Sequence, residues 1–241
     1  MRLLVYNIRY GTGGRRYTFP WGGYLRRTSD NLSSITSFIR SVNPDIMGLI
    51  EVDDGSYRSA RRNQAESIAQ DLGHYHAYRS KYGEASFVNR LPLMKQQGNA
   101  FLSRDNINGA RFHYFNKGAK RLVIELELDN IVIFLVHLAL GFRVRHSQLS
   151  DLYSLVKGTE KPHVVAGDFN ALWGDDEINL FMGATGLINA NKEGWPSYPS
   201  WLPRRQLDFV LHSPDISSKR LWMPSVHYSD HLPLIWDFEL P

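Results

Sequence analysis

The sequence of 241 residues contains no cysteine. This absence excludes a disulfide framework, a thiol nucleophile and any zinc or iron–sulfur site held by cysteine, so His, Asp, Glu and Asn remain as metal ligands. No apolar run approaches the ~18 residues that a membrane-spanning helix needs. The N-terminus, MRLLVYNIRYG, lacks the apolar segment and cleavage site of a signal peptide. We therefore expect a cytoplasmic protein, although a leader removed beforehand would leave the same sequence.

Repeats, low-complexity stretches and linkers are absent as well. Hydrophobic residues make up 43% and charged residues 22% of the chain, which is near the average for folded proteins and argues against disorder or a coiled coil. A chain of this length can bury a sizeable core. We expect one domain over residues 1–241 and a monomer.

The basic residues are mostly arginine, which accounts for 20 of the 28, and the net charge is +4. Surface salt bridges or a GC-rich genome would explain this bias, but so would a phosphate-bearing substrate, because the planar guanidinium matches phosphate oxygens. The segment 10–28 combines five glycines, two arginine pairs and several aromatic residues. It reads as a long loop that either binds a base or phosphate or is anchored to the core by its aromatic side chains.

Runs rich in Val, Ile, Leu and Phe alternate with amphipathic helical windows. The helices are expected to begin at Asp30, as N-cap, near Tyr57 and near Arg143, and Asp129-Asn130 forms a hairpin turn. Strands and helices with hairpins between them favour an α/β sandwich around mixed sheets. The expected strands are Arg2–Asn7, Asp45–Glu51, Asn99–Ser103, Arg121–Leu128, Ile131–His137, His163–Asp168, Leu207–Leu211 and Leu234–Phe238.

Polar residues stand where several of these apolar runs end or begin. In a mixed sandwich, the ends of some strands and the starts of antiparallel ones share one edge, so we expect these residues to form one joint site. One Asp at a strand end would mean little, since turns favour Asp. The residues concerned are Asn7, Glu51, His137 and Asp168 at strand ends, and Asp208 and Asp230-His231 at strand starts.

This set has a coherent chemistry. Glu51 with Asn7 beside it supplies hard oxygen ligands for Mg²⁺, with Mn²⁺ as a substitute. Asp168 can take a proton from water, and Asn170 can orient that water or donate to a phosphoryl oxygen. Asp208 can hold His231 by its ring N–H, which fixes the tautomer.

The blocks GDFNA at 167–171, LDFVL at 207–211 and YSDHLPL at 228–234 resemble the signatures of the endonuclease/exonuclease/phosphatase superfamily. VYNIRYG, LIEVD, GNAFLSR and VHLALGF match further blocks in order, so the resemblance covers the whole chain. It implies the DNase-I-like, four-layered α/β sandwich and a Mg²⁺-dependent phosphoesterase. It also implies that Glu51 is the principal metal ligand beside Asn7 and that Asp230 binds or neighbours a metal. His231 would contact the scissile phosphate, and His137 would contact the phosphate or the leaving oxygen. Asp168, or alternatively His231, would be the general base.

Three further residues are candidates for substrate binding. Arg58 follows Glu51 closely enough to reach a phosphate, and Trp173 follows Asn170 by three residues, although loop packing explains it equally well. Asn99 either lines the site or bonds neighbouring strands. We expect a nuclease acting on nucleic acid; the alternatives are a phosphatase or phospholipase C-type hydrolase of sphingomyelin, sugar or inositol phosphates, and a non-catalytic phosphate-binding module.

Overall fold

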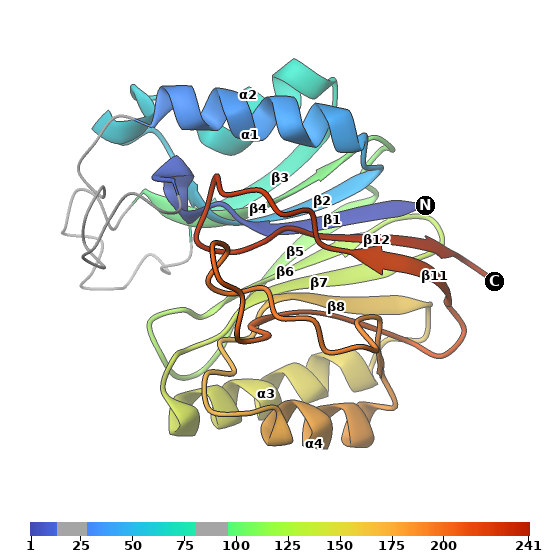
Figure 1. The fold of residues 1–241 in the computed structure, drawn as a ribbon. Coiled ribbons are helices and arrows are strands. Elements are labelled where there is room, and N and C mark those ends of the chain that lie inside the picture. The colour runs from blue at the N-terminus through green and yellow to red at the C-terminus, as the bar shows by residue number, and fades with distance from the viewer. Residues whose placement is uncertain (14–27, 81–95) are drawn as a thin grey trace.

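Two β-sheets pack face to face, and helices cover the outer face of each (Figure 1). The computed structural model describes residues 1–13, 28–80 and 96–241. Helices α1 (Ser29–Val42) and α2 (Gln64–Leu72) cover one sheet, and α3 (Phe142–Lys157) and α4 (Asp176–Thr185) cover the other. This arrangement confirms the expected four-layered α/β sandwich of two mixed sheets.

Within the described residues, each sheet has six strands, and only one pair of neighbouring strands in each is parallel. The first sheet has the order β11 (Ser217–Trp222), β12 (Leu234–Glu239), β1 (Arg2–Asn7), β2 (Ile46–Asp53), β4 (Gln97–Ser103) and β3 (Tyr75–Ser80). The second has the order β5 (Gly109–Tyr114), β6 (Leu122–Glu127), β7 (Val132–His137), β8 (His163–Asp168), β10 (Asp208–His212) and β9 (Ile188–Asn189). The parallel pairs are β1–β2 and β7–β8.

All eight strands predicted from apolar runs are present, and the helix near Arg143 is α3. Two predictions about helix starts are wrong. The N-cap of α1 is Thr28, so Asp30 lies within the first turn, where its charge favours the helix dipole. Tyr57–Ser59 forms only a 3-10 turn, and α2 begins after Asn63, whose side chain caps the helix. Most of the basic, aromatic segment at 10–28 falls on 14–27, outside the described residues.

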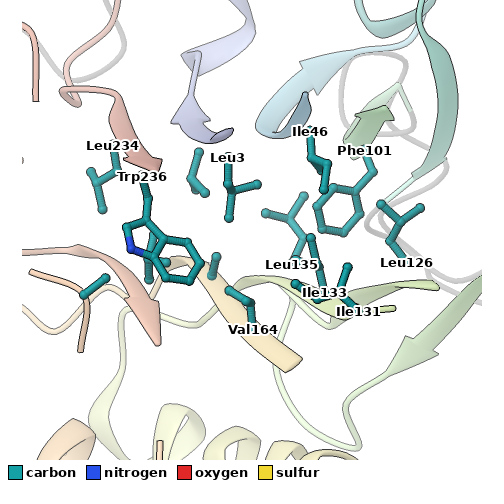
Figure 2. Close-up of a cluster of buried hydrophobic side chains, with 14 of the residues drawn as sticks. Leu3, Ile46, Phe101, Leu126, Ile131, Ile133, Leu135, Val164, Leu234 and Trp236 are labelled. Carbon is teal, nitrogen blue, oxygen red and sulfur yellow. The ribbon is translucent and has the colours of Figure 1, made fainter. Parts of the chain in front are cut away.

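The main hydrophobic core lies between the two sheets (Figure 2). Leu3 and Trp236 enter it from the first sheet, and Ile133 and Leu135 enter from the second; all four are fully buried. Full burial of each such side chain contributes about 1.5–3 kcal/mol, and more for the indole. Because the outer faces of the sheets are covered by helices, the central strands are apolar on both faces, which is why they were visible as continuous runs.

The strand directions bring many chain segments to one edge of the sandwich. β1, β2, β7 and β8 end there, whereas β4, β10 and β12 begin there. The strand register places three of the predicted site residues side by side. His137 pairs with Asp168, and Asp168 pairs with Asp208, on three adjacent strands. Among the described helices, the longest has 16 residues, and none has the length and apolar character needed to cross a bilayer.

Candidate active site

A hydrogen bond between two side chains joins the sheets at this edge. Nδ2 of Asn7, the last residue of β1, donates to Oδ2 of Asp168, the last residue of β8, over 3.1 Å. Both residues are buried. A polar contact that crosses an otherwise apolar interface fixes how the two sheets meet, because a one-residue slip would leave both groups unpaired. The predicted gathering of strand-end residues therefore begins with a contact between residues 161 positions apart.

The backbone of the GDFN block explains two of its residue types. Gly167 has φ of 144°, and a Cβ there would lie 2.0 Å from the carbonyl oxygen of Val136, so only glycine fits. Asn170 has φ of 52°, a conformation that Asn tolerates better than most residues. Its backbone N–H donates to Oδ1 of Asp168 over 3.0 Å, and its Nδ2 donates to the carbonyl oxygen of Leu138 over 2.8 Å. The turn thus fixes both predicted side chains.

Asp208 and His231 form the predicted pair. Nδ1 of His231 lies 2.8 Å from Oδ2 of Asp208, and both side chains are buried. Oγ of Ser197 donates to the same oxygen over 2.6 Å and accepts from the backbone N–H of Asp208 over 3.2 Å. Because Nδ1 faces Asp208, Nε2 is the nitrogen that points onward, and it lies 3.9 Å from Oδ2 of Asp168.

Burial and charge act on the two central groups in opposite ways. Burial alone lowers the pKa of His231, but the carboxylates of Asp208 and Asp168 outweigh it and raise that pKa to about 10. Burial raises the pKa of Asp168 to about 6, although His231 and Lys120 pull it down. At neutral pH the arrangement therefore favours a protonated imidazole beside a carboxylate that gains and loses its proton easily.

Glu51 stands on a distorted part of β2. A β-bulge interrupts the pairing of β2 with β4 at this position, and φ of Glu51 is 57°. Such strain in a non-glycine residue is typical of functional sites, where it directs a side chain away from the regular pleat. The backbone N–H of Glu51 donates to Oδ1 of Asn99 over 3.3 Å. Its carboxylate faces His137, with Oε1 3.9 Å from Nε2 of that ring.

His137 lies between two carboxylates and one lysine. Its Nε2 is 3.4 Å from Oδ2 of Asp168 and also contacts Nζ of Lys120. Nζ of Lys120 is 4.0 Å from Oε1 of Glu51. Lys120 was not predicted from the sequence, because a lone lysine before β6 gives no signal until β6 and β7 are known to be neighbours.

Asp230 was predicted to bind or neighbour a metal, and in the structure its charge is met by an arginine. Nε of Arg9 lies 3.4 Å from Oδ2 of Asp230, and both side chains are largely buried. Arg9 has φ of 45°, and its backbone N–H donates to Oδ1 of Asn7 over 3.1 Å. This position of Arg9 was not predicted from the sequence either, because the excess of arginine indicated a charge but no particular residue.

The three substrate-binding candidates lie in different surroundings. Arg58 is fully buried and donates to Asp53 over 2.6 Å, so the structure gives it a partner inside the protein and does not support a contact with substrate. Asn99 is buried and bonds the backbone of Glu51, which matches the alternative that it holds neighbouring strands. Trp173 is 82% exposed, which excludes the packing alternative for this residue.

The donor atoms suggest where a cation could bind. Asp168, Asp208 and His231 offer ligand atoms within 4.8 Å of one another. Oδ2 of Asp208 already accepts from Ser197 and faces the ring N–H of His231, so we interpret these two residues as a hydrogen-bonded pair rather than as ligands. Glu51 and Asn7 provide carboxylate and amide oxygens near Asp168, and oxygen donors fit a hard divalent ion.

Comparisons with known proteins agree with this fold. The model of the Endonuclease/Exonuclease/phosphatase family matches residues 4–231. The catalytic domain of human nocturnin, solved with a bound sulfate anion, has 20% identity and a TM-score of 0.70, covering 100% of this chain and 93% of that one. The mannosyl-6-phosphatase of Bacteroides thetaiotaomicron VPI-5482 has 14% identity and a TM-score of 0.73, with 100% of both chains covered.

A structure of an endonuclease/exonuclease/phosphatase from Beutenbergia cavernae has 17% identity and a TM-score of 0.74, covering 99% of this chain and 71% of that one. The TM-scores establish a common fold, and at identities this low the three structures establish nothing beyond the fold. The search of curated proteins finds no match for the sequence.

Proposed function

The chain belongs to the endonuclease/exonuclease/phosphatase family, and on that premise we propose that it hydrolyses phosphodiester bonds with an activated water molecule, with nucleic acid as the favoured substrate. One observation carries the proposal. Oδ2 of Asp168 accepts from Asn7 on the opposite sheet and lies within 4 Å of His137 and His231. A carboxylate, two imidazoles and an amide around one point can supply a base for the attacking water and donors for the phosphoryl oxygens.

We further propose that Glu51, with Asn7 beside it, holds Mg²⁺ or, as a substitute, Mn²⁺. A bound divalent ion would neutralise phosphate charge and lower the pKa of a bound water. The oxygen donors and the distorted backbone at Glu51 support this assignment.

The residues of the chain take separate roles in this proposal. Asp168 is the general base that accepts a proton from water, and Asn170, held through Leu138, orients that water. His231 donates from Nε2 to a phosphoryl oxygen, because Nδ1 is directed to Asp208. Lys120 adds a positive charge on the side of Glu51, and its ammonium group contacts Nε2 of His137. A pKa of about 10 keeps the His231 imidazole protonated at neutral pH, whereas a pKa of about 6 leaves the Asp168 carboxylate able to accept a proton, which supports Asp168 as the base.

The excess of arginine and the net charge of +4 support a polyanionic substrate. A phosphatase acting on a sugar phosphate is the second candidate, favoured by the fold shared with the mannosyl-6-phosphatase. A non-catalytic phosphate-binding module would not need the buried Asp208–His231 pair, so this pair argues against it.

The test measures release of p-nitrophenol from bis(p-nitrophenyl) phosphate, nicking of plasmid DNA and phosphate release from mannose 6-phosphate, with Mg²⁺, Mn²⁺ or EDTA. We expect metal-dependent cleavage of the diesters that falls at least a hundredfold in Asp168→Asn and His231→Ala. The matched controls are Asp105→Asn and His163→Ala, at positions away from the site, which should retain activity. Undiminished diester cleavage in both site variants would overturn the proposal.

A further inference from the structure

An open pocket of about 570 Å³ lies beside the candidate active site. One wall is the loop that follows β8 and Asn170, and the other belongs to the segment that leads into β10. The lining includes Ala171, Trp173, Asp175, Arg204, Arg205 and Gln206. Its volume lies in the range of pockets that bind small molecules or single units of a polymer.

Both walls are tied to the proposed catalytic residues. Ala171 directly follows Asn170, and Gln206 stands two residues before Asp208. The guanidinium of Arg205 donates to the carbonyl oxygen of Leu172, which joins one wall to the other. A group bound in this pocket would therefore lie next to a phosphate that contacts Asn170 and the imidazole of His231, which Asp208 holds.

Trp173 is the most exposed large hydrophobic side chain of the described residues, at 82%. By contrast, Trp236 in the core is fully buried. An indole left in water forgoes the stabilisation that burial would bring, which is of the order of 2–3 kcal/mol. Proteins that bind single-stranded nucleic acid use exposed aromatic side chains in a basic groove as platforms on which bases stack.

The charge of the pocket is positive. Arg204 and Arg205 are both exposed, and Asp175 is the acidic residue among the lining side chains. The segment of the two arginines is held by its backbone, because the N–H groups of Arg204 and Arg205 both donate to the carbonyl oxygen of Tyr198. Two guanidinium groups beside an exposed indole match a unit that carries both a flat ring and a negative charge.

We propose that this pocket binds the nucleotide unit next to the scissile phosphate of a polynucleotide, with its base stacked on Trp173 and its flanking phosphate on Arg204 and Arg205. The assignment rests on the proposed phosphodiesterase function and specifies its substrate. A sugar phosphate would place no planar ring on Trp173 and would need one anion site, which the catalytic edge already supplies. Stacking does not discriminate between bases, so the subsite favours nucleic acid without reading its sequence.

The test measures binding of a fluorescein-labelled single-stranded oligonucleotide by anisotropy, in the cleavage-deficient Asp168→Asn background. We expect Trp173→Ala to weaken binding about tenfold or more and Trp173→Phe to retain most of the affinity. Arg204→Ala should weaken binding and reduce the slope of log K against log salt by about one. The matched controls are Tyr75→Ala and Lys157→Ala, both exposed at the opposite edge of the sandwich, which should bind like the background.

Steady-state cleavage of the same oligonucleotide by the otherwise wild-type chain gives the second readout. Trp173→Ala should raise KM about tenfold and change kcat little, because the indole holds the substrate without touching the reacting atoms. Wild-type affinity and KM in Trp173→Ala would overturn the subsite while leaving the phosphodiesterase proposal intact. Absence of any diester cleavage by the wild-type chain would overturn the phosphodiesterase proposal itself. Cleavage of mannose 6-phosphate without oligonucleotide binding would overturn the polynucleotide assignment.

Discussion

The guanidinium of Arg9 lies 3.4 Å from the carboxylate of Asp230, and both are largely withdrawn from solvent. The negative charge of Asp230 is therefore already balanced by the positive charge of Arg9. A carboxylate already balanced in this way gains less from a divalent ion than one whose cationic neighbours are more distant. The Glu51 carboxylate has a more distant cationic neighbour, because Nζ of Lys120 lies 4.0 Å from its Oε1.

We therefore expect Glu51→Gln to weaken Mn²⁺ binding at least tenfold and Asp230→Asn to weaken it less than threefold. Isothermal titration calorimetry of the purified chain measures both values, together with the number of ions bound. Glu66→Gln, at an exposed position on α2, is the control for removing one negative charge. Equal losses in the Glu51 and Asp230 variants would make Asp230 a metal ligand, as the family resemblance implied.

Lys120 is expected to contribute to catalysis through its charge. Its ammonium group contacts His137 and faces Glu51, so its removal takes one cation from the edge where phosphate charge would develop. Lys120→Ala should lower kcat about a hundredfold, in the range found when one stabilising donor is removed, whereas Lys120→Arg should restore part of the rate. The exposed Lys117→Ala, three residues earlier, is the control. An unchanged kcat in Lys120→Ala would exclude this role.

Substitution by alanine should lower the free energy of unfolding at Gly167 and raise it at Gly183. A Cβ at Gly167 would meet the backbone of Val136 at 2.0 Å and would require φ of 144°, so Gly167→Ala should destabilise the fold by at least about 3 kcal/mol. Gly183 lies inside α4, and a Cβ added there would have nothing within 4 Å, so Gly183→Ala should stabilise by about 0.5–1 kcal/mol. Urea unfolding followed by circular dichroism measures both, and destabilisation at Gly183 would contradict the argument.

The His212 ring should contribute less to the free energy of unfolding in acid than at neutral pH. Burial lowers the pKa of His212 below its ordinary 6.5, and the ring stacks on Trp236 with centroids 5.1 Å apart. Nδ1 bonds the carbonyl oxygen of Ser213, whereas Nε2 is buried without a hydrogen-bond partner in the structure, so a second ring proton would be unsatisfied. The folded state therefore favours the neutral ring. The stability that this ring contributes is complete above the unfolded pKa near 6.5 and is lost as the pH falls below it.

Urea unfolding at pH 7.5 and pH 5.0 tests this dependence. The raised pKa values of His231 and Asp168 favour the folded state at the lower pH and are present in both proteins, so the comparison is with the variant. Between pH 7.5 and pH 5.0, the wild-type chain should lose stability relative to His212→Phe, which keeps a ring over Trp236 but has no group to protonate. His163→Ala, at a partly exposed position, should keep the wild-type difference. An equal pH dependence in His212→Phe and wild type would rule out His212 as its source.

The sequence predicted the parts of the fold whose residue pattern follows from burial. Central strands such as β7 are apolar throughout because both faces are covered, whereas β11 (SSKRLW) and β5 (GARFHY) lie at sheet edges, are half-exposed and gave no comparable signal. A polar residue that ends an apolar run can be recognised from the sequence alone, as Asn7 and Asp168 were. Arg9, Lys120 and Ser197 could not be recognised in this way, because their partners come from other strands.

The place of β12 in the first sheet has a consequence for how the chain matures. This last strand pairs with β1, and His231 stands three residues before it. The pairing of β12 with β1 therefore carries His231 to the edge where Asp168 stands, with its Nε2 3.9 Å from Oδ2 of that residue. The proposed site is thus complete only when two segments far apart in the sequence, residues 2–7 and 234–239, have paired during folding.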